Sequence, residues 1–466
     1  MVKHGRSGQP EQSMHRSASQ TPHPIAISLG DAFARAGFDL YEVGGSVRDR
    51  LLGSVVSDYD FATNAQPDDT RSVLQSLAEG SAFSVGDKFG TIGYRVNDFD
   101  AEITTYRGEQ YVDDSRHPQV TFSATLAEDL ARRDFTVNAM ALPAAGGDLI
   151  DPFDGQSDLR NSLLRGVDDP EERFREDPLR MLRAARLASK LRFEIEPTTV
   201  AAMSAQADRV KILSAERLFD ESTKLLMTEH VSAGMNVLLQ TEVLVRYLPE
   251  VADLAKITDP GPHHKLDVWT HTLNVVAGVQ PRPEVRWAAL LHDLGKYSTQ
   301  SLEPDGRMRF FGHEAVSAKL SDDIMVRLRA SNRFRQTVTT LVANHMRPHA
   351  YGETWTDGAV RRLERDSDGH FDWLIDLAVA DARATNDDER SKYSRLRSRA
   401  EQLHIQVPKP SSPLSGSELS EGLGREPGAW IKPIKEQLTE LVIDGVLAPD
   451  DKAAAWRIVK ERFSEP

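Results

Sequence analysis

The pattern of apolar residues changes near residue 169, and this change limits the possible folds more than any single motif does. Before it, short apolar runs with strand character, such as LYEVGG, TIGYRV and AEITTY, alternate with helix-like segments. After it, segments such as RFREDPLRMLRAARLASKL and FDWLIDLAVADA place apolar residues at the spacing of amphipathic helices. We therefore predict an α+β fold, with a mixed sheet and helices in an N-terminal head and helices alone in the rest of the chain.

The 466 residues provide enough chain for several compact units. We predict five parts: a polar, disordered N-terminus (1–24), the head (25–165), a helical neck (166–262), a second helical domain (263–390) and a helical tail (391–466). A loop rich in Pro and Ser, QVPKPSSPLSGSELS, separates off the last helical piece.

Composition excludes several classes of protein. The sequence has no apolar run long enough to span a membrane and no signal peptide at its N-terminus, so we expect a cytoplasmic protein without a membrane partner. It has no cysteine, which excludes disulfides and iron-sulfur clusters and leaves His, Asp and Glu as metal ligands. The net charge of -14 argues mildly against nucleic acid as a partner, but a net charge can hide a local basic cluster.

Two aspartates in the strand-like segment DYDFAT are the first candidates for chemistry. Strand alternation places Asp58 and Asp60 on one face, where their carboxylates repel unless a cation lies between them. Such a pair alone is more often part of an exposed strand. In FGTIGYRVNDFDAEITTYR, two further strand-like runs are joined by the turn-rich NDFD. Glu102 on the second run is a candidate third carboxylate, although the alternation equally allows a solvent-facing residue.

The segment before the aspartates favours a functional interpretation. Gly44 and Gly45 follow an apolar strand and precede a short helix, so backbone N–H groups at the helix start can hold an anion, with Arg48 nearby. Gly53 is suited to end that helix. An anion site beside paired aspartates suits transfer of a nucleotidyl group, in which two Mg²⁺ ions about 3.5–4 Å apart bridge carboxylates, triphosphate and attacking hydroxyl.

Five motifs, in this order and spacing, carry a resemblance to a known family: GGSVRDRLLG, DYDFAT, AEITTYR, RRDFTVNAMA and FREDPLRMLRAARL. They resemble the bacterial (class II) CCA-adding tRNA nucleotidyltransferases of the DNA polymerase β superfamily, close relatives of bacterial poly(A) polymerases. The resemblance covers residue 25 to the middle of the chain and continues more loosely beyond it. It implies that Asp58 and Asp60 hold catalytic magnesium ions and that Glu102 assists them.

The resemblance also implies which residues contact the incoming nucleotide. Gly44, Gly45 and Arg48 would contact the triphosphate, and Arg133 and Asp134 would contact the phosphates and ribose. From the residues alone, RRDFTVNAMA predicts an apolar helix that starts near Asp134, and both interpretations can hold together.

A later helix, in REDPLRMLRAAR, is suited to reading the base. Pro178 fits a first helical turn, which places Asp177, Arg180 and Arg183 at three-residue intervals on one face. Cytosine and adenine each present an amino donor beside a ring-nitrogen acceptor, which an aspartate beside an arginine complements. Uracil and guanine present the reverse, and each polar group left unpaired costs about 1–3 kcal/mol. Asp177 and Arg180 can therefore select CTP and ATP without a template, the role that the resemblance implies for this E-D-x-x-R pattern.

The same region is the local basic cluster that the net charge conceals. Its members are Arg173, Arg175, Arg180, Arg183, Arg186, Lys190 and Arg192. Phosphate contacts by such residues would make RNA binding sensitive to salt, whereas the simpler alternative is a solvated face with intrahelical ion pairs. We include Arg183 and Arg186 among the candidate nucleotide-binding residues.

Three features bear on which polymer end is extended. Phe89-Gly90-Thr91 matches the FGT of the CCA-type pattern, and the R-F-x-L-x-H type of stretch found in the poly(A) relatives is absent from that region. The segment 107–129 is longer than the shortened loop of enzymes that add only CC. We therefore predict addition of C, C and A to the tRNA 3′ end from CTP and ATP, with A-addition alone and poly(A) synthesis as alternatives.

A second set of candidate ligands lies in THTL, LLHDLGK, FGHE, ANHMRPH and AVADARATN. An adjacent His-Asp pair in an apolar helix buries polar groups, and a divalent metal can be their partner. The set resembles an HD-type metal-dependent phosphohydrolase, which in some CCA-adding relatives acts on phosphate monoesters and 2′,3′-cyclic phosphates. The resemblance implies four core ligands and two for a possible second metal: His271, His292, Asp293 and Asp381, then His313 and His345. Such ligands do not choose among Mg²⁺, Mn²⁺, Ni²⁺, Co²⁺ and Fe.

Two other classes of function stay open. In one, the HD site is the working centre of a phosphohydrolase and the head is inactive. In the other, the chain is a non-catalytic RNA-binding protein that uses only the basic helix. The paired aspartates, the two glycines and the E-D-x-x-R pattern argue against an inactive head. The sequence does not indicate an oligomeric state.

Overall fold

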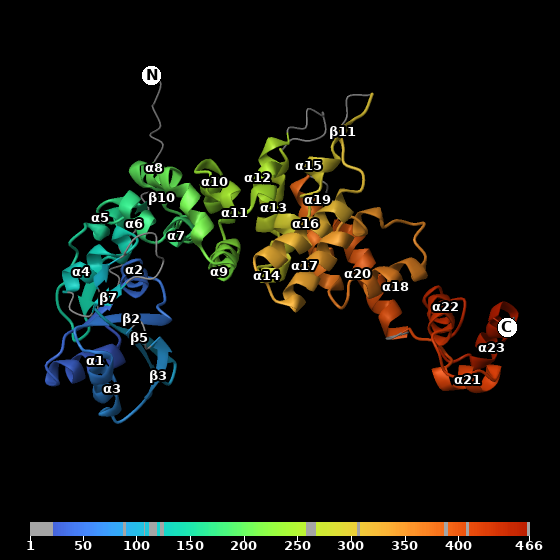
Figure 1. The fold of residues 1–466 in the computed structure, drawn as a ribbon, viewed down its shortest axis with the longest axis horizontal. Helices are drawn as coiled ribbons and strands as arrows, with labels where there is room; N and C mark the ends of the chain where they lie inside the picture. Colours follow the sequence, from blue (N-terminus) through green and yellow to red (C-terminus); the bar gives the residue numbers. More distant parts are fainter. Residues whose placement is uncertain are drawn as a thin grey trace, which may run out of the picture. The chain divides into compact units, whose positions relative to one another are not determined.

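The structure is a computed structural model of residues 1–466 (Figure 1). It describes residues 22–86, 90–106, 108–110, 119–121, 125–257, 267–304, 308–385, 390–406 and 410–463. Most of the predicted disordered N-terminus, 1–24, therefore lies outside the described residues. Two compact units are present, one on each side of the boundary between Ile212 and Leu213. The predicted neck, 166–262, contributes helices to both units.

The first unit is built on a mixed sheet of six strands in the order β3-β4-β5-β2-β1-β8. Neighbouring strands are antiparallel except β2 and β5, which are parallel. Their bounds are β1 (Leu40–Val43), β2 (Asp58–Thr63), β3 (Ser81–Gly86), β4 (Thr91–Val96), β5 (Phe99–Thr105) and β8 (Ala141–Pro143). A separate antiparallel pair joins β6 (Gly108–Gln110) and β7 (Gln119–Thr121). The predicted mixed sheet of the head is confirmed.

From Asp58 to Phe61, the side chains of β2 alternate between a buried face and an exposed face of the sheet. Tyr59 and Phe61 point into a buried cluster with Leu29, Phe33 and Ile103, whereas Asp58 and Asp60 are exposed. The helices of this part are α1 (Pro24–Arg35), α2 (Gly45–Leu51), α3 (Pro67–Gln75), α4 (Leu126–Ala131) and α5 (Gly155–Arg160). The aspartates therefore stand opposite the face that this core covers.

The prediction of an apolar helix in RRDFTVNAMA is wrong. The segment forms a single 3₁₀ turn, η2 (Thr136–Asn138), and then enters β8. Every residue from Asp134 to Leu142 is buried, the polar Asp134, Thr136 and Asn138 included, so the segment has no solvent-exposed face that would fix a helical period. β8 pairs with β1 at the sheet edge, with Ala141 opposite Val43, and this pairing satisfies the backbone in place of a helix.

The rest of the first unit is helical, apart from a short parallel pair of β9 (Leu163–Leu164) and β10 (Glu194–Ile195). Its helices are α6 (Pro170–Glu176), α7 (Leu179–Leu191), α8 (Pro197–Gln206) and η3 (Ala207–Ile212). Asp177 is extended, which ends α6, and Pro178 then precedes the first turn of α7 as the sequence predicts. The amphipathic α7 buries Met181, Leu182 and Ala185.

The second unit is helical, with one short hairpin of β11 (Ser301–Leu302) and β12 (Met308–Arg309). Its first helices are α9 (Ala215–Leu226), α10 (Val231–Gln240), α11 (Val243–Tyr247), α12 (Pro249–Ala252) and η4 (Asp253–Lys256). The next are α13 (Val268–Gly278), α14 (Pro283–Leu291), α15 (Lys296–Thr299), α16 (His313–Arg327), α17 (Asn332–Asn344), η5 (Pro348–Ala350), α18 (Asp357–Asp366), α19 (Phe371–Ala384) and α20 (Arg390–Gln406). The last are α21 (Gly416–Leu423), α22 (Ile431–Ile443) and α23 (Lys452–Phe463), around a core of Leu419, Leu438 and Val459. In the described part of the chain, none of these helices combines the length and apolarity needed to cross a bilayer.

Candidate active site and candidate metal centre

The three predicted carboxylates of the head lie together on one face of the sheet. Asp58 and Asp60 come from β2 and Glu102 from the adjacent parallel strand β5. In the register of that pair Asp60 lies directly opposite Glu102, and all three residues are exposed. This is the placement that strand alternation predicts for Asp58 and Asp60, and Glu102 lies beside them on the same exposed face, so its role as a third carboxylate stays a prediction.

The surroundings of Asp60 shift the pKa of its carboxyl group. Desolvation by the surrounding protein, together with Glu102 and Asp58, raises its pKa to about 6, although Arg133 and Arg183 lower it. A raised pKa means that the ionised carboxylate lacks sufficient positive charge nearby. Oxygen ligands crowded in this way suit Mg²⁺, and a bound divalent cation would remove the repulsion.

A glycine stands directly over Asp60. Gly44 precedes α2 with φ of +73°, and a Cβ at this position would lie 3.0 Å from Nη1 of Arg133 and 3.6 Å from Oδ2 of Asp60. Any larger residue would therefore be strained and would fill space between the loop and the carboxylate. At the other end of α2, Gly53 has φ of +70° and ends the helix as predicted.

Arg48 is buried next to the glycine loop and is hydrogen-bonded to other protein groups. Its residue is only 4% exposed, and its Nη1 donates to Oδ1 of Asn138 at 2.6 Å while Nε donates to Asp49 at 2.8 Å. The guanidinium would lie 3.4 Å from a Cβ at Gly45, so it supports the glycine loop from below. A contact between Arg48 and a triphosphate stays a prediction.

Arg133 is held in place by a residue that the sequence reasoning missed. Asp129, at the end of α4, is 1% exposed and accepts hydrogen bonds from Arg132 at 2.7 Å and from Arg133 at 2.9 Å. Burial raises the pKa of Asp129, but the two arginines outweigh it and leave that pKa lowered. The helical spacing of three and four residues between this aspartate and the arginines was a signal for the pairing.

Asp134 is buried and fully engaged with protein groups. Its Oδ1 accepts from Asn138 Nδ2 at 3.0 Å, and its Oδ2 accepts from Arg183 Nε at 2.8 Å. Burial alone would raise the pKa of Asp134, but Arg183 and these hydrogen bonds hold it below its usual range. The structure thus brings Asp134 and Arg183 together, two residues that the sequence assigned separately to nucleotide binding.

The proposed base-reading residues lie at the start of α7. Asp177 Oδ1 accepts from the backbone N–H of Leu179, the first residue of α7, at 3.1 Å. Arg180 is buried, and it donates to Glu176 at 3.2 Å and to the carbonyl oxygen of Arg132 at 2.8 Å. Arg180 is therefore fixed against the segment that carries Arg133.

Most of the basic cluster is paired with acids. Arg173 and Arg175 form ion pairs within α6, which is the simpler alternative foreseen for them, and Lys190 lies 3.5 Å from Asp49. Arg186 is half-buried on α7, and Arg192 is exposed where α7 ends.

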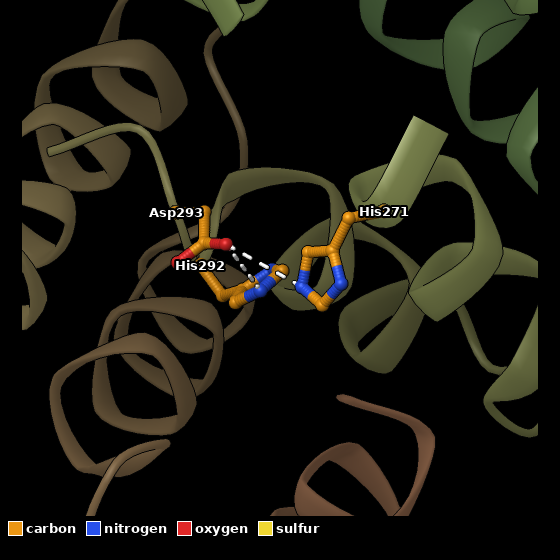
Figure 2. A group of neighbouring side chains, drawn as sticks. All are labelled: His271, His292 and Asp293. Carbon is orange, nitrogen blue, oxygen red and sulfur yellow. Dashed lines mark ion pairs between the residues drawn. The ribbon is translucent and has the colours of Figure 1, made fainter. Parts of the chain in front are cut away.

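The second set of candidate ligands gathers in the helical unit. His271 from α13 and the pair His292 and Asp293 at the end of α14 point toward one another (Figure 2). The Nε2 atoms of His271 and His292 lie 3.5 Å and 3.1 Å from Oδ2 of Asp293. All three residues are buried and form a group with the spacing of metal ligands.

A second group shares Asp293. Its Oδ1 lies 3.3 Å from Nε2 of His313, which in turn lies 3.3 Å from Nε2 of His345. Asp293 therefore stands between two candidate metal positions, and the six predicted HD residues except Asp381 belong to these two groups.

Asp381 joins the centre through two imidazoles. Its carboxylate oxygens lie 3.1 Å from Nε2 of His271 and 3.0 Å from Nε2 of His349. His349 was missed as a candidate, although it lies one helical turn after His345 in the quoted segment ANHMRPH. The Tyr393 hydroxyl lies 2.8 Å from Nδ1 of His349 and fixes that ring.

The donor atoms of this centre fit a divalent metal. The Nδ1 atoms of His292, His313 and His345 each lie 2.7–2.8 Å from a backbone carbonyl, which sets the tautomer and leaves Nε2 as the free ligand atom. Among the described residues, Nε2 of His292 is buried without a hydrogen-bond partner, whereas Oδ2 of Asp293 forms an ion pair with Nζ of Lys296 at 2.7 Å. Burial and the neighbouring His292 lower the pKa of His345 to about 3, so its imidazole is neutral, as a metal ligand must be.

Comparisons with known proteins find separate family models for the head and for the part that holds the histidine cluster. The chain matches the models of the "Poly A polymerase head domain" over residues 40–165, the "Probable RNA and SrmB- binding site of polymerase A" over 192–254 and the "HD domain" over 264–404. Fold, carboxylates and these models define a polymerase-type nucleotidyltransferase head joined to an HD domain, and both parts imply the use of divalent metal ions.

Full-length relatives narrow this class to one family. A CCA-adding enzyme of Geobacillus stearothermophilus is 30% identical over 450 residues, covering 95% of this chain and 98% of the relative. The crystal structure of the Bacillus stearothermophilus CCA-adding enzyme in complex with CTP matches with a TM-score of 0.69 and 25% identity, over 94% of this chain and 97% of that one. The chain belongs to the CCA-adding enzyme family.

Other relatives match in part or carry a different name. A CCA-adding enzyme of Levilactobacillus brevis is 42% identical, but the match spans 51% of this chain and 60% of the relative. An A-adding tRNA nucleotidyltransferase of Deinococcus radiodurans is 33% identical over 89% of this chain and 94% of its own. The family thus includes relatives named for two related activities.

Proposed function

We propose that this chain adds C, C and A to the 3′ end of tRNA, using CTP and ATP and releasing pyrophosphate. The observation that carries the proposal is the register of Asp60 opposite Glu102, beside Asp58 and beneath Gly44, in a member of this family. The terminal tRNA hydroxyl forms a new bond to the α-phosphate of the incoming nucleotide as the bond to pyrophosphate breaks.

In this proposal Asp58, Asp60 and Glu102 hold Mg²⁺, the ion proposed for the head. When bound, Mg²⁺ makes the attacking hydroxyl more acidic and stabilises negative charge on the leaving group. Gly44 and Gly45 leave room for the triphosphate close to the backbone, and Arg133, oriented by Asp129, supplies positive charge beside it.

Base choice is assigned to Asp177 and Arg180. The short contacts of Arg180 to Glu176 and to the Arg132 carbonyl fix the direction of its guanidinium before a nucleotide arrives. A fixed donor beside an acceptor favours cytosine and adenine, because uracil and guanine would leave polar groups unpaired at a cost of about 1–3 kcal/mol each.

Two alternatives concern the polymer end. A-addition alone is the activity named for the Deinococcus relative, and poly(A) synthesis is the other. The features that argue against them, Phe89 and most of the loop within 107–129, lie outside the described residues. The choice among these activities therefore rests on the sequence and on the family.

One assay separates the three activities. Each labelled nucleotide is offered to a tRNA transcript that ends before CCA, to one that ends in CC, and to oligoadenylate. We expect incorporation of CTP and then ATP on the first transcript, with a stop after CCA. Incorporation of ATP on the CC end alone would make the chain an A-adding enzyme, and long tails on oligoadenylate would make it a poly(A) polymerase.

The unpartnered ring nitrogens of the HD centre support a second candidate function, metal-dependent hydrolysis of phosphate esters. His271, His292, Asp293 and Asp381 would hold one divalent ion, and His313 and His345 a second with Asp293; the metal is Mg²⁺, Mn²⁺, Ni²⁺, Co²⁺ or Fe. Phosphate release from a phosphate monoester and opening of a 2′,3′-cyclic phosphate, with each metal in turn, test this function. The control is a His292→Ala variant, and equal hydrolysis by that variant would refute the proposal.

The proposed division of labour involves four of the five predicted parts. The head (25–165) performs the transfer, the neck (166–262) reads the base, the HD domain (263–390) hydrolyses, and the tail (391–466) contacts tRNA. The cytoplasm is the proposed location.

A further inference from the structure

A buried chain of hydrogen bonds crosses the first unit from α2 to α7 by way of η2. Arg48 on α2 donates to Oδ1 of Asn138 at 2.6 Å, and Nδ2 of Asn138 donates to Oδ1 of Asp134 at 3.0 Å. Oδ2 of Asp134 then accepts from Arg183 on α7 at 2.8 Å. The chain links three segments that are far apart in the sequence.

Asn138 is the junction of this chain. It is 6% exposed, between Arg48 at 4% and Asp134 at 7%, so each polar atom needs a partner within the protein. A side-chain amide offers an acceptor for the arginine and a donor for the carboxylate at one position. A hydrocarbon side chain would remove one buried hydrogen bond from Arg48 and one from Asp134, and a carboxylate would meet Asp134 with a like charge.

The two ends of the chain have different proposed tasks. Arg48 lies beneath the glycine loop that would hold the triphosphate, 3.4 Å from a Cβ built at Gly45. Arg183 lies one turn after Arg180 on the helix proposed to read the base. A further contact links α7 directly to α2: Lys190 of α7 lies 3.5 Å from Asp49 of α2, and Asp49 also pairs with Arg48.

We propose that Asn138 is a positioning residue that keeps the phosphate-binding loop and the base-reading helix in one geometry. The inference rests on the proposed nucleotidyl transfer. A nucleotide anchored by its phosphates presents its base at a fixed place, so Asp177 and Arg180 discriminate only while α7 keeps its position relative to α2. Loosening that link weakens the good hydrogen bonds of cytosine and adenine more than the poor ones of uracil and guanine.

The test compares Asn138→Ala with a matched loss of another buried hydrogen bond in the same 3₁₀ turn. Thr136 is 2% exposed and its hydroxyl donates to Asp158 at 2.7 Å, outside the chain from Arg48 to Arg183. Incorporation of CTP, ATP, UTP and GTP into a tRNA transcript gives kcat and KM for each variant. We expect Asn138→Ala to lower the preference for CTP over UTP by about tenfold or more, and Thr136→Val to lower the melting temperature without changing that preference.

A second variant keeps the test decisive if Asn138→Ala does not fold. Asn138→Asp has the same shape and still accepts from Arg48, but it loses the donor to Asp134, so it should also lose discrimination. A folded Asn138 variant with the wild-type preference, or an equal loss in Thr136→Val, would overturn the inference while leaving the transfer activity in place. A wild-type protein that incorporates no nucleotide would instead overturn the proposed function, and this inference with it.

Discussion

The head and the HD centre both contain clustered carboxylates, but different neighbouring groups shift the pKa values of these carboxylates in opposite directions. In the head, three exposed carboxylates face one another with arginines behind them, and the pKa of Asp60 rises to about 6 through desolvation and through Glu102 and Asp58. In the HD centre, the buried Asp293 and the half-buried Asp381 lie among imidazoles, and their pKa values fall well below the usual range because the neighbouring histidines, with Lys296 beside Asp293, outweigh the effect of burial.

This difference predicts how each site gains its metal. The HD centre offers nitrogen and oxygen donors from the protein alone, so it can bind an ion without substrate. The head offers only three carboxylates on an open face, and Mg²⁺ at such sites keeps several waters or takes phosphate oxygens. We therefore expect nucleotide and metal to bind together in the head and metal to bind by itself in the HD centre.

The largest expected effect comes from removing a head carboxylate. Asp60→Ala should reduce nucleotide incorporation by about 10³-fold, because several kcal/mol of metal-based stabilisation are lost. Phosphate release by the HD centre and its metal content should not change. The matched control is Asp100→Asn, which alters a neighbouring carboxylate of β5 that pairs with Arg95. Retained incorporation in Asp60→Ala would contradict the assignment of the head.

The converse variant tests the HD centre. Asp293 stands between both groups of ligands, so Asp293→Asn should weaken metal binding by about 100-fold or more and abolish phosphate release. Incorporation of CTP and ATP should continue at the wild-type rate. Metal bound per chain, measured by elemental analysis after dialysis against Mn²⁺ or Ni²⁺, gives a readout independent of hydrolysis. Unchanged metal content would show that this group is not the metal site.

An intermediate effect is expected at the glycine loop. In Gly44→Ala the new Cβ would lie 3.0 Å from Arg133 at a φ of +73°, so the KM for both nucleotides should rise about tenfold. Gly53→Ala is the matched control, since its φ is +70° but no atom lies within 4 Å of the new Cβ. Both variants should lose about 1–2 kcal/mol of stability from backbone strain, and only the first should change KM. If KM rises in both variants, the rise comes from a disturbed fold of α2 and not from the space next to Gly44.

Sequence patterns predicted the contents of both sites. Alternation in β2 placed Asp58 and Asp60 on one face, and the resemblance to HD-type phosphohydrolases identified the five residues that form the two ligand groups. Residues that act through partners distant in sequence were not predictable in this way. The burial of Arg48 against Asn138 depends on how α2 packs on η2, 90 residues later in the chain.

The structure of the RRDFTVNAMA segment was also not predictable from its local sequence. Its apolar residues are buried on all sides, so no period distinguishes a helix from the short turn and edge strand that form. His349 was missed because nothing in its local sequence shows that Tyr393 and Asp381 meet it.

A smaller effect is expected one step away from the HD ligands. Tyr393→Phe removes the hydroxyl that fixes His349, which in turn lies 3.0 Å from Asp381. Metal affinity should fall by about 3- to 10-fold, because the ligand carboxylate is less well oriented. Tyr247→Phe is the control, since its buried hydroxyl, 3.2 Å from Ser222, belongs to the same unit. Equal losses of affinity in both variants would indicate a general loosening of the unit.

The smallest expected effect concerns stability and pH in the head. Because the pKa of Asp60 is raised from its ordinary value near 4 to about 6, the ionised carboxylate destabilises the folded protein above that range, and protonation relieves the cost as the pH falls through 6. With metals chelated, Asp60→Asn should therefore stabilise the protein at pH 8, by on the order of 1 kcal/mol after allowing for solvent screening, and by about half as much at pH 5, which lies midway between the two pKa values. Thermal melts at the two pH values measure the difference. A variant that is less stable than the wild type at pH 8 would show that Asp60 is held by its arginines as a structural ion pair, and that the repulsion proposed to draw a metal into the head is absent.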